Sequence, residues 1–303
     1  MSETNIKSPL SWDNCTYLTC SVLPVFQACN CDCKFCFSKS SISALKNEKS
    51  LLDKIDVHQY YQWARQNGAS RLVITGGGEP LLKSEMVLQL VKDGNQYFDE
   101  ITCFTNGTYL TKDLTAKLLA NGLNYVCYSR HHYDDKKNQK LMGKSAPPLV
   151  DFMQNANGLT IRATCVMTKG FIDTKEEVWN YIEVLSKFGV KQFTFKHTYE
   201  TYENSVFKES NQNKWVGIHK IDFDPFKNQG KVINRLPWGP EIREIDDFQV
   251  CYYYEPDPNW EKKNKICRSS NLLANGKVYA SLEETQSQLF QLMPSKQPLP
   301  QVM

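Results

Sequence analysis

Strand-type and helix-type segments alternate along the first two thirds of the chain, and this alternation restricts the possible folds most strongly. Short runs of branched and aromatic residues recur about every 25 to 30 residues, and segments with helical periodicity separate most of them. We expect strands at 17–26, 71–75, 100–104, 124–128, 159–167 and 190–195, and helices at 53–67, 83–92, 111–120 and 174–188. Six such alternations predict a parallel sheet with helices outside it, and barrels of this kind place their chemistry at the C-terminal ends of the strands.

Four cysteines lie within eight residues just after the first expected strand, and Cys29, Cys33 and Cys36 have the spacing C-x3-C-x2-C. A cubic 4Fe-4S cluster ordinarily takes four Cys ligands, so three thiolates on one loop would leave one iron open to a substrate or cofactor. A zinc ribbon is the alternative, but it normally brings a second Cys or His pair about 12 to 20 residues further on, and none follows here. A disulfide cluster fits poorly with a chain that has no secretory signal.

The second expected strand, residues 71–75, runs directly into Gly76-Gly77-Gly78-Glu79-Pro80. Three glycines let the backbone approach a ligand closely, and Glu79 places a carboxylate beside it. A phosphate-binding loop would need a Lys-Ser/Thr ending, which this segment lacks. A tight strand-to-helix turn with an incidental Glu is the other interpretation.

These features together resemble the radical S-adenosylmethionine (radical SAM) superfamily over about residues 15–200, including the aromatic Phe35 before the last Cys. The resemblance implies a partial (βα)6 barrel, one 4Fe-4S cluster on Cys29, Cys33 and Cys36, and SAM bound to the open iron. In that family, reductive cleavage of SAM releases methionine and a 5′-deoxyadenosyl radical that abstracts hydrogen. The cluster works at a low potential, so a flavodoxin or ferredoxin electron donor is implied as well.

The resemblance also implies which side chains hold SAM, because the family's contacts lie at the ends of the strands. Carried onto this chain, the SAM contacts are Phe35, Gly77, Gly78, Glu79, Thr105, Asn106, Ser129, Arg130 and Arg162. Polar residues at strand ends are nevertheless common in any barrel.

Two further groups of polar residues follow expected strands. His131 and His132, with Asp134 and Asp135 behind them, could bind a second metal or a substrate anion. A helix start with a capping Asp explains the same residues, so we expect no metal there and keep the two His as candidate substrate contacts. Lys196 and His197 are candidate catalytic residues if they face the barrel mouth rather than its rim.

Asn275-Gly276 between two short apolar runs predicts a β-hairpin. The segment resembles the SPASM or twitch hairpin of the GTP 3′,8-cyclase group, in which a C-x2-C-x13-C pattern holds a second 4Fe-4S cluster. On this chain the three ligand positions are Asn264, Cys267 and Ser281, so we expect no second cluster. Cys267 could instead donate a hydrogen atom to a product radical, or it could be a small buried residue. The spacing of Cys15, Cys20 and Cys251 requires no metal.

We expect four parts: an N-terminal segment 1–14, a barrel 15–198, an extension 199–290 and a flexible tail 291–303. Within the extension, 199–250 is expected to form an irregular layer wrapping the barrel, and alternating apolar residues predict one antiparallel strand at 242–254. The net charge of +3 on 303 residues indicates neither nucleic acid nor a membrane, and the chain has no apolar run long enough for a signal or spanning helix. Eleven cysteines then suggest a reducing, cytoplasmic compartment.

The expected function is hydrogen abstraction from a small polar metabolite, such as a sugar, nucleotide or amino acid derivative. A ribosomal peptide is the alternative substrate, and an iron-sulfur or zinc binding module without catalysis is the alternative from another class.

Overall fold

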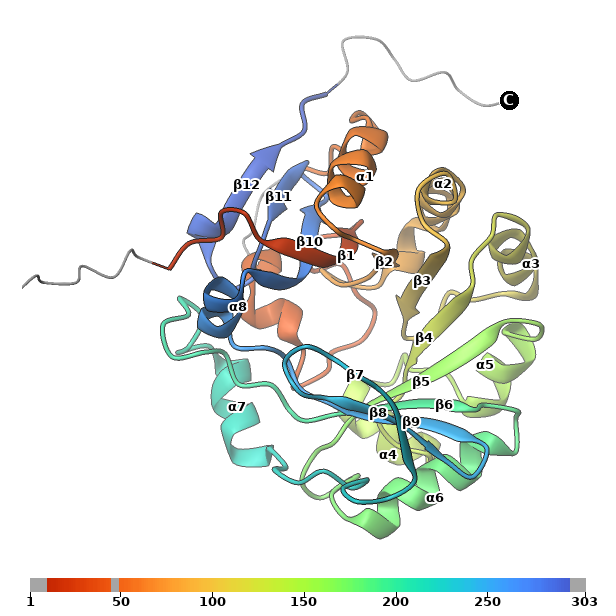
Figure 1. The fold of residues 1–303 in the computed structure, drawn as a ribbon. Coiled ribbons are helices and arrows are strands. Elements are labelled where there is room, and N and C mark those ends of the chain that lie inside the picture. The colour runs from red at the N-terminus through yellow and green to blue at the C-terminus, as the bar shows by residue number, and fades with distance from the viewer. Residues whose placement is uncertain (1–9, 45–48, 295–303) are drawn as a thin grey trace, which may run out of the picture.

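The computed structural model describes residues 10–44 and 49–294, and its centre is one sheet of twelve strands. The first six strands lie side by side in sequence order, and each of β1 to β5 pairs in parallel with the next. These strands are β1 (Thr16–Leu23), β2 (Arg71–Ile74), β3 (Glu100–Thr105), β4 (Tyr125–Ser129), β5 (Thr160–Val166) and β6 (Gln192–Lys196). The sheet is curved and does not close, so the predicted partial (βα)6 barrel is confirmed (Figure 1).

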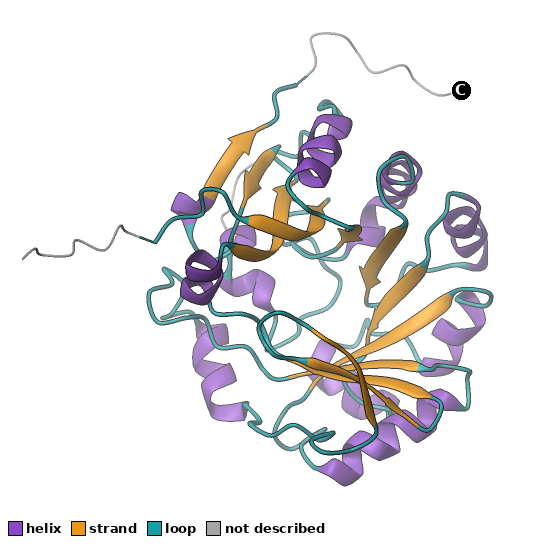
Figure 2. Ribbon diagram, viewed as in Figure 1, coloured by secondary structure: helices purple, strands orange, loops and turns teal. Residues whose placement is uncertain are grey.

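Helices cover the outer side of this curved sheet, as the sequence pattern predicted (Figure 2). The outer helices are α1 (Val57–Gln66), α2 (Ser84–Gly94), α3 (Lys112–Ala120), α5 (Leu149–Asn155) and α6 (Lys175–Ser186). The chain also forms α4 (Asp135–Met142) and α7 (Asn211–His219), which pack near the cysteine loop, and α8 (Pro258–Asn264), which packs on β10. Asp56 accepts a hydrogen bond from the backbone N–H of His58 and so begins α1. Short 3-10 helices lie at η1 (Phe37–Ser40), η2 (Ile42–Ala44), η3 (Pro80–Lys83) and η4 (Thr285–Ser287).

The C-terminal third extends both edges of the barrel sheet. On one side β10 (Ile266–Leu273) pairs in parallel with β1, followed by β11 (Lys277–Tyr279) and β12 (Gln288–Gln291). On the other side β9 (Phe248–Tyr253) pairs in parallel with β6, followed by β8 (Glu241–Ile245) and β7 (Lys231–Arg235). The extension therefore shares one sheet with the barrel, and the domain boundaries expected from the sequence stay a prediction.

Two expectations about the extension differ from the structure. Residues 242–254 do not form one strand, because the chain turns at Asp246, whose φ of 52° is left-handed, and returns as β9. Residues 199–250 are also not wholly irregular, since they contain α7, β7 and β8. The Asn275-Gly276 hairpin is confirmed by the antiparallel pairing of β10 with β11 and by the φ of 83° at Gly276.

The main core fills the space between the sheet and the outer helices. Tyr60 and Tyr61 of α1 are fully buried there, and Tyr60 donates a hydrogen bond to the backbone oxygen of Ser21 on β1. This bond fixes α1 against the strand that leads into the cysteine loop. Most of the expected tail, 295–303, lies outside the described residues, as does 1–9. Within the described ranges, no helix has the length and apolarity needed to cross a membrane.

Candidate active site

A cavity of about 540 Å³ occupies the inside of the barrel and reaches the cysteine loop. Strands β10, β1 to β6 and β9 all contribute inward-facing side chains to its wall. Closed barrels fill this space with large branched residues. Here many inward positions carry small side chains instead, including Ser21, Thr102, Cys127, Thr164 and Thr194. Because these inward side chains are small, the barrel interior has room for ligands beside the cysteines.

The cysteine loop lies at the C-terminal end of β1, where the sequence placed it, and Cys29, Cys33 and Cys36 all line the cavity. A backbone hydrogen bond of 3.3 Å from Cys36 to Cys33 holds the last turn of the loop. The Asp32 backbone N–H donates to Met142 at the end of α4 at 2.7 Å, which fixes the middle of the loop. The three thiols are therefore presented from one loop whose ends and middle are anchored.

Three thiolates on one loop suit an iron-sulfur cube, in which they leave the fourth iron open. In the described part of the chain, no three His, Cys, Asp or Glu side chains converge as the ligands of one ion would. Each iron of a cube takes one thiolate, so its Cys ligands need not converge on a single point. Hydrogen bonds from Cys31, through its side chain and its backbone N–H, lower the pKa of Cys29 to about 6, which favours the ligating thiolate.

The glycines of the Gly-Gly-Gly-Glu segment are required by the cysteine loop itself. A Cβ on Gly77 would lie 1.8 Å from the Val25 oxygen, and one on Gly78 would lie 2.0 Å from the Ala28 oxygen. The backbone N–H of Glu79 donates to the same Ala28 oxygen at 2.8 Å. The sequence predicted that the glycines let the backbone approach a ligand closely. In the structure, the glycine backbone closely approaches the backbone of Val25 and Ala28 instead.

Glu79 is buried, and its carboxylate joins the segment after β2 to the end of β3 by hydrogen bonds. One carboxylate oxygen accepts hydrogen bonds from the Thr105 hydroxyl at 2.8 Å and the Leu81 N–H at 3.0 Å, and the other accepts from the Asn106 N–H at 2.7 Å. Burial raises the pKa of this carboxyl to about 7. Gly77, Gly78, Glu79, Thr105 and Asn106 all line the cavity beside the cysteines, as does Phe35. Their contact with SAM stays a prediction.

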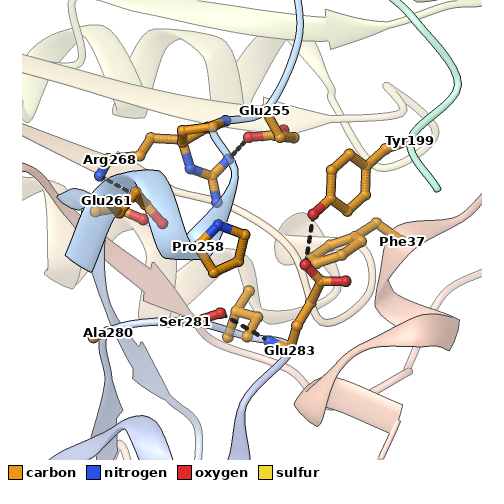
Figure 3. A pocket seen from close by; sticks show the side chains of 12 residues that line it. Phe37, Tyr199, Glu255, Pro258, Glu261, Arg268, Ala280, Ser281 and Glu283 are labelled. Carbon is orange, nitrogen blue, oxygen red and sulfur yellow. Dashed lines mark hydrogen bonds and ion pairs between the residues drawn. The ribbon is translucent and has the colours of Figure 1, made fainter. Parts of the chain in front are cut away.

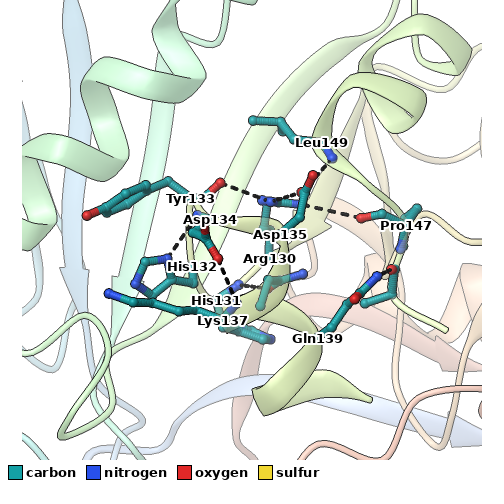
Figure 4. Close-up of polar contacts among 12 residues, drawn as sticks. Arg130, His131, His132, Tyr133, Asp134, Asp135, Lys137, Gln139, Pro147 and Leu149 are labelled. Carbon is teal, nitrogen blue, oxygen red and sulfur yellow. Dashed lines mark hydrogen bonds and ion pairs between the residues drawn. The ribbon is translucent and has the colours of Figure 1, made fainter. Parts of the chain in front are cut away.

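Three residues of the predicted site do not line the cavity: Arg130, His132 and Cys267. Arg130 is fully buried and donates to Asp135 at 2.5 Å and to the Tyr133 oxygen at 3.1 Å, so it holds the segment after β4 together (Figure 4). His132 accepts from the Asp134 N–H in the same segment. These positions argue against the SAM contact expected of Arg130 and the substrate contact expected of His132.

Cys267 is buried in a small apolar cluster with Cys15 and Tyr17. Its side chain therefore has no access to a radical in the cavity, which argues against the hydrogen-donor role. Of the other two positions in the twitch-like pattern, Asn264 is exposed at the end of α8, while Ser281 lines a separate pocket (Figure 3). Cys267 is thus the single thiol among the three positions.

Ser129 lines the cavity, and so does Arg162, although Arg162 lies near the start of β5, away from the cysteine loop. Its guanidinium donates to the Tyr125 hydroxyl and to Gln192, both at 3.1 Å. Tyr125 in turn donates to Glu100 at 2.6 Å. These side chains lie at the end of the cavity formed by the starts of the strands. The cysteine loop lies at the other end of the strands, and this disfavours a contact between Arg162 and SAM.

His131 lines the cavity next to the cysteine loop, with its ring edge-on to Phe35 at 4.6 Å between centroids. Burial lowers the pKa of His131 to about 3, so the imidazole is neutral. Its Nδ1 accepts a hydrogen bond from the Val166 N–H at 3.0 Å, and the remaining proton must therefore sit on Nε2. His131 thus offers a hydrogen-bond donor at the site, independent of pH in the neutral range.

Lys196 and His197 both line the cavity, and the structure adds two partners that the sequence analysis missed. The Lys196 ammonium lies 3.8 Å from Glu255, and the second oxygen of Glu255 accepts from Arg268 at 2.5 Å (Figure 3). Glu255 follows β9 and Arg268 lies on β10, so this group links the two strands that flank the six strands of the barrel. Recognising β9 as a strand parallel to β6 would have placed Glu255 at the strand ends.

Comparisons with known proteins agree with this geometry. Residues 23–185 match the family described as the Radical SAM superfamily. The GTP 3′,8-cyclase of Aquifex aeolicus is 27% identical over 267 residues, which cover 84% of this chain and 78% of that protein. The probable GTP 3′,8-cyclase of Saccharolobus solfataricus is 28% identical over 170 residues, and the match spans about half of each protein, 54% and 52%.

Among solved structures, Streptococcus suis SuiB bound to S-adenosylmethionine has a TM-score of 0.57 at 17% identity. The match covers 87% of this chain but only 60% of SuiB. At this identity the likeness concerns the fold alone. The family match covers more than half of the chain and includes both the cysteine loop and the Gly-Gly-Gly-Glu segment. The chain is an enzyme of the radical SAM type, related to the GTP 3′,8-cyclase group, and belongs to the radical SAM superfamily.

Proposed function

We propose that this enzyme abstracts a hydrogen atom from a small polar metabolite, such as a sugar, nucleotide or amino acid derivative, held in the barrel cavity. Cys29, Cys33 and Cys36 would hold one 4Fe-4S cluster, and the loops around Glu79 and Asn106 would hold SAM. When bound, these cofactors supply the electron and the 5′-deoxyadenosyl radical that removes hydrogen from the substrate. A flavodoxin or ferredoxin would supply the electron to the cluster.

The observation that carries this proposal is a set of free hydroxyl groups inside the barrel. Five hydroxyl side chains from five strands or strand ends line the cavity, and none of them hydrogen-bonds to another side chain or backbone group of the described residues: Ser21, Thr75, Ser129, Thr164 and Thr194. A hydroxyl both donates and accepts, so such a wall suits the hydroxyl and amide groups of a polar metabolite. None of the five is among the buried side-chain atoms of the described residues that lack a partner, so these hydroxyls are accessible from the cavity and available to a ligand or water.

GTP is the second candidate, because the Aquifex aeolicus relative is a GTP 3′,8-cyclase. Phosphate groups are bound by arginine and lysine side chains with free donors. In this cavity Arg268 and Lys196 already face Glu255, and Arg71 lies 3.5 Å from Glu100. Lys196 and Arg268 share the single carboxylate of Glu255, and a triphosphate would have to draw these cations away from it.

A peptide substrate is the third candidate, since SuiB has also been solved bound to its precursor peptide SuiA. This match covers 59% of the SuiB chain, so peptide binding is proposed here only as an alternative. The cavity lies inside the barrel and is lined by strand residues. A small molecule can enter such a space as a whole, whereas a peptide could place only one side chain in it.

The test uses protein reconstituted with iron and sulfide without oxygen, then mixed with SAM and dithionite. We expect about four irons per chain and formation of 5′-deoxyadenosine, and we expect Cys33→Ala to abolish the product. Cys165→Ala is the matched control, because Cys165 is buried in the outer core and does not line the cavity. Protein that carries zinc, or an iron cluster that leaves SAM intact, would disprove the proposal.

Candidate substrates are then compared by the 5′-deoxyadenosine formed above the background without substrate. Thr194→Val removes one free hydroxyl at nearly constant shape, so it should weaken stimulation by a polar metabolite while leaving the background unchanged. Stimulation by GTP alone would favour the cyclase candidate, and stimulation by a peptide alone would favour the maturase candidate.

A further inference from the structure

We propose that Asn106 is a positioning residue whose side-chain amide donates to the sulfur of Cys29 and makes the bound cluster easier to reduce. This inference rests on the cluster of the proposed function, but not on the identity of the substrate. The family resemblance implies only a contact with SAM for Asn106.

The orientation of the Asn106 side chain is fixed by its neighbours. Its Oδ1 accepts a hydrogen bond from the backbone N–H of Thr108 at 3.0 Å. Because a backbone N–H can only donate, the oxygen must face Thr108 and the amide nitrogen must face the other way. That nitrogen donates to Asn30 Oδ1 at 2.9 Å and lies 3.7 Å from Cys29 Sγ. The N–H groups are therefore directed at the cysteine loop.

Asn30, the residue after Cys29, is held on its other side as well. Its own amide donates to the Thr108 hydroxyl at 2.8 Å, and that hydroxyl donates to the Ser145 oxygen at 2.9 Å. Asn106 is buried, with only 6% of its surface exposed, so water does not compete strongly for these bonds. The position of Cys29 is thus fixed from β3 through the side chain of Asn106.

The same residue also joins the cysteine loop to the glutamate loop. The Asn106 backbone N–H donates to Glu79 at 2.7 Å, and the Glu79 backbone N–H donates to the Ala28 oxygen at 2.8 Å. Ala28 precedes Cys29, so the hydrogen bonds form a closed circuit through Glu79, Asn106 and the cysteine loop. A shift of one loop must move the other.

Hydrogen bonds to ligand sulfurs are one of the features that set the reduction potential of an iron-sulfur cluster. Reduction adds negative charge to the cluster, and part of that charge resides on the cysteine sulfurs. An N–H directed at Cys29 stabilises this added charge more than it stabilises the oxidised state. The backbone N–H of Cys31 makes a second such contact at 3.4 Å, and it remains when the side chain of Asn106 is changed.

The test is a redox titration of the reconstituted protein, followed by the electron paramagnetic resonance signal of the reduced cluster. Asn106→Leu keeps the size and the backbone contact to Glu79 but removes the amide. We expect a tenfold lower equilibrium constant for reduction, which is a midpoint potential about 59 mV more negative. Tyr109→Phe is the matched control, because it removes an exposed hydroxyl of the same loop and keeps the amide at Cys29.

Asn106→Asp is the second variant, since it retains the oxygen that accepts from Thr108 and places a second oxygen near the sulfur. Its potential should be more negative than that of Asn106→Leu. Unchanged potentials in both variants at full iron content would overturn the inference, and so would an equal shift in Tyr109→Phe. If the wild-type protein itself takes up no cluster, the proposed function fails, and this outcome is distinct from a failure of the role of Asn106.

Discussion

Replacing Gly78 by alanine tests whether the Gly-Gly-Gly-Glu segment and the cysteine loop depend on one another. The added Cβ would lie 2.0 Å from the Ala28 oxygen and 2.6 Å from its carbonyl carbon. An ordinary contact begins at 3.4 Å, so the backbone before Cys29 must move by at least about 1.4 Å. Gly78 does not have a positive φ, and the whole effect therefore comes from this collision.

The expected loss of stability has two parts. Overpacking at a rigid backbone contact costs about 1–3 kcal/mol. The displaced Ala28 oxygen also loses its hydrogen bond from the Glu79 N–H, which adds about 1 kcal/mol. A total of about 2–4 kcal/mol is a large fraction of the 5–15 kcal/mol typical of a folded domain, yet it leaves most molecules folded. The Gly78→Ala variant should therefore fold with lower stability and with Cys29 out of place.

Urea unfolding of the iron-free protein measures the first effect, and the iron content after reconstitution measures the second. Gly170→Ala is the control, because a Cβ there meets nothing within 4 Å and the change costs only the strain of a positive φ. The control should keep its iron. A Gly78→Ala variant with the unfolding midpoint and iron content of the wild type would refute the argument that these glycines make room for the cysteine loop.

Other variants test the remaining parts of the site. Burial raises the pKa of Glu79 from 4.5 to about 7, so the folded iron-free protein keeps a proton that the unfolded chain releases, and its stability should fall between pH 4.5 and 7. In Glu79→Gln, the decrease in the free energy of unfolding over this pH range, measured with urea, should be smaller by roughly 3 kcal/mol. The same dependence of the unfolding free energy on pH in both proteins would contradict this. Glu255→Gln leaves Arg268 without its carboxylate partner and should lower the free energy of unfolding by about 1–3 kcal/mol. The double variant Glu255→Gln/Arg268→Met should recover part of this stability, because it no longer buries an unpaired charge. Cys267→Ala should still form 5′-deoxyadenosine at the wild-type rate, and a loss of product at full iron content would return Cys267 to the mechanism.

The sequence alone determined the features that depend on local spacing. Alternating strand and helix patterns predicted the parallel sheet, because their periods follow from backbone geometry within a few residues. The cysteine spacing and the glycines before Glu79 are equally local, and the structure places both at one end of the barrel. Asn275-Gly276 specified its hairpin through the left-handed backbone that the turn requires.

The tertiary structure alone decided which polar side chains share the cavity. Ser129, the last residue of β4, lines the cavity, whereas Arg130 lies just beyond the strand and is buried against Asp135. Glu255 and Arg268 meet Lys196 only because β9 and β10 add to opposite edges of one curved sheet. Such pairings depend on sheet order and curvature, which are properties of the whole chain and leave no mark in any short stretch of it.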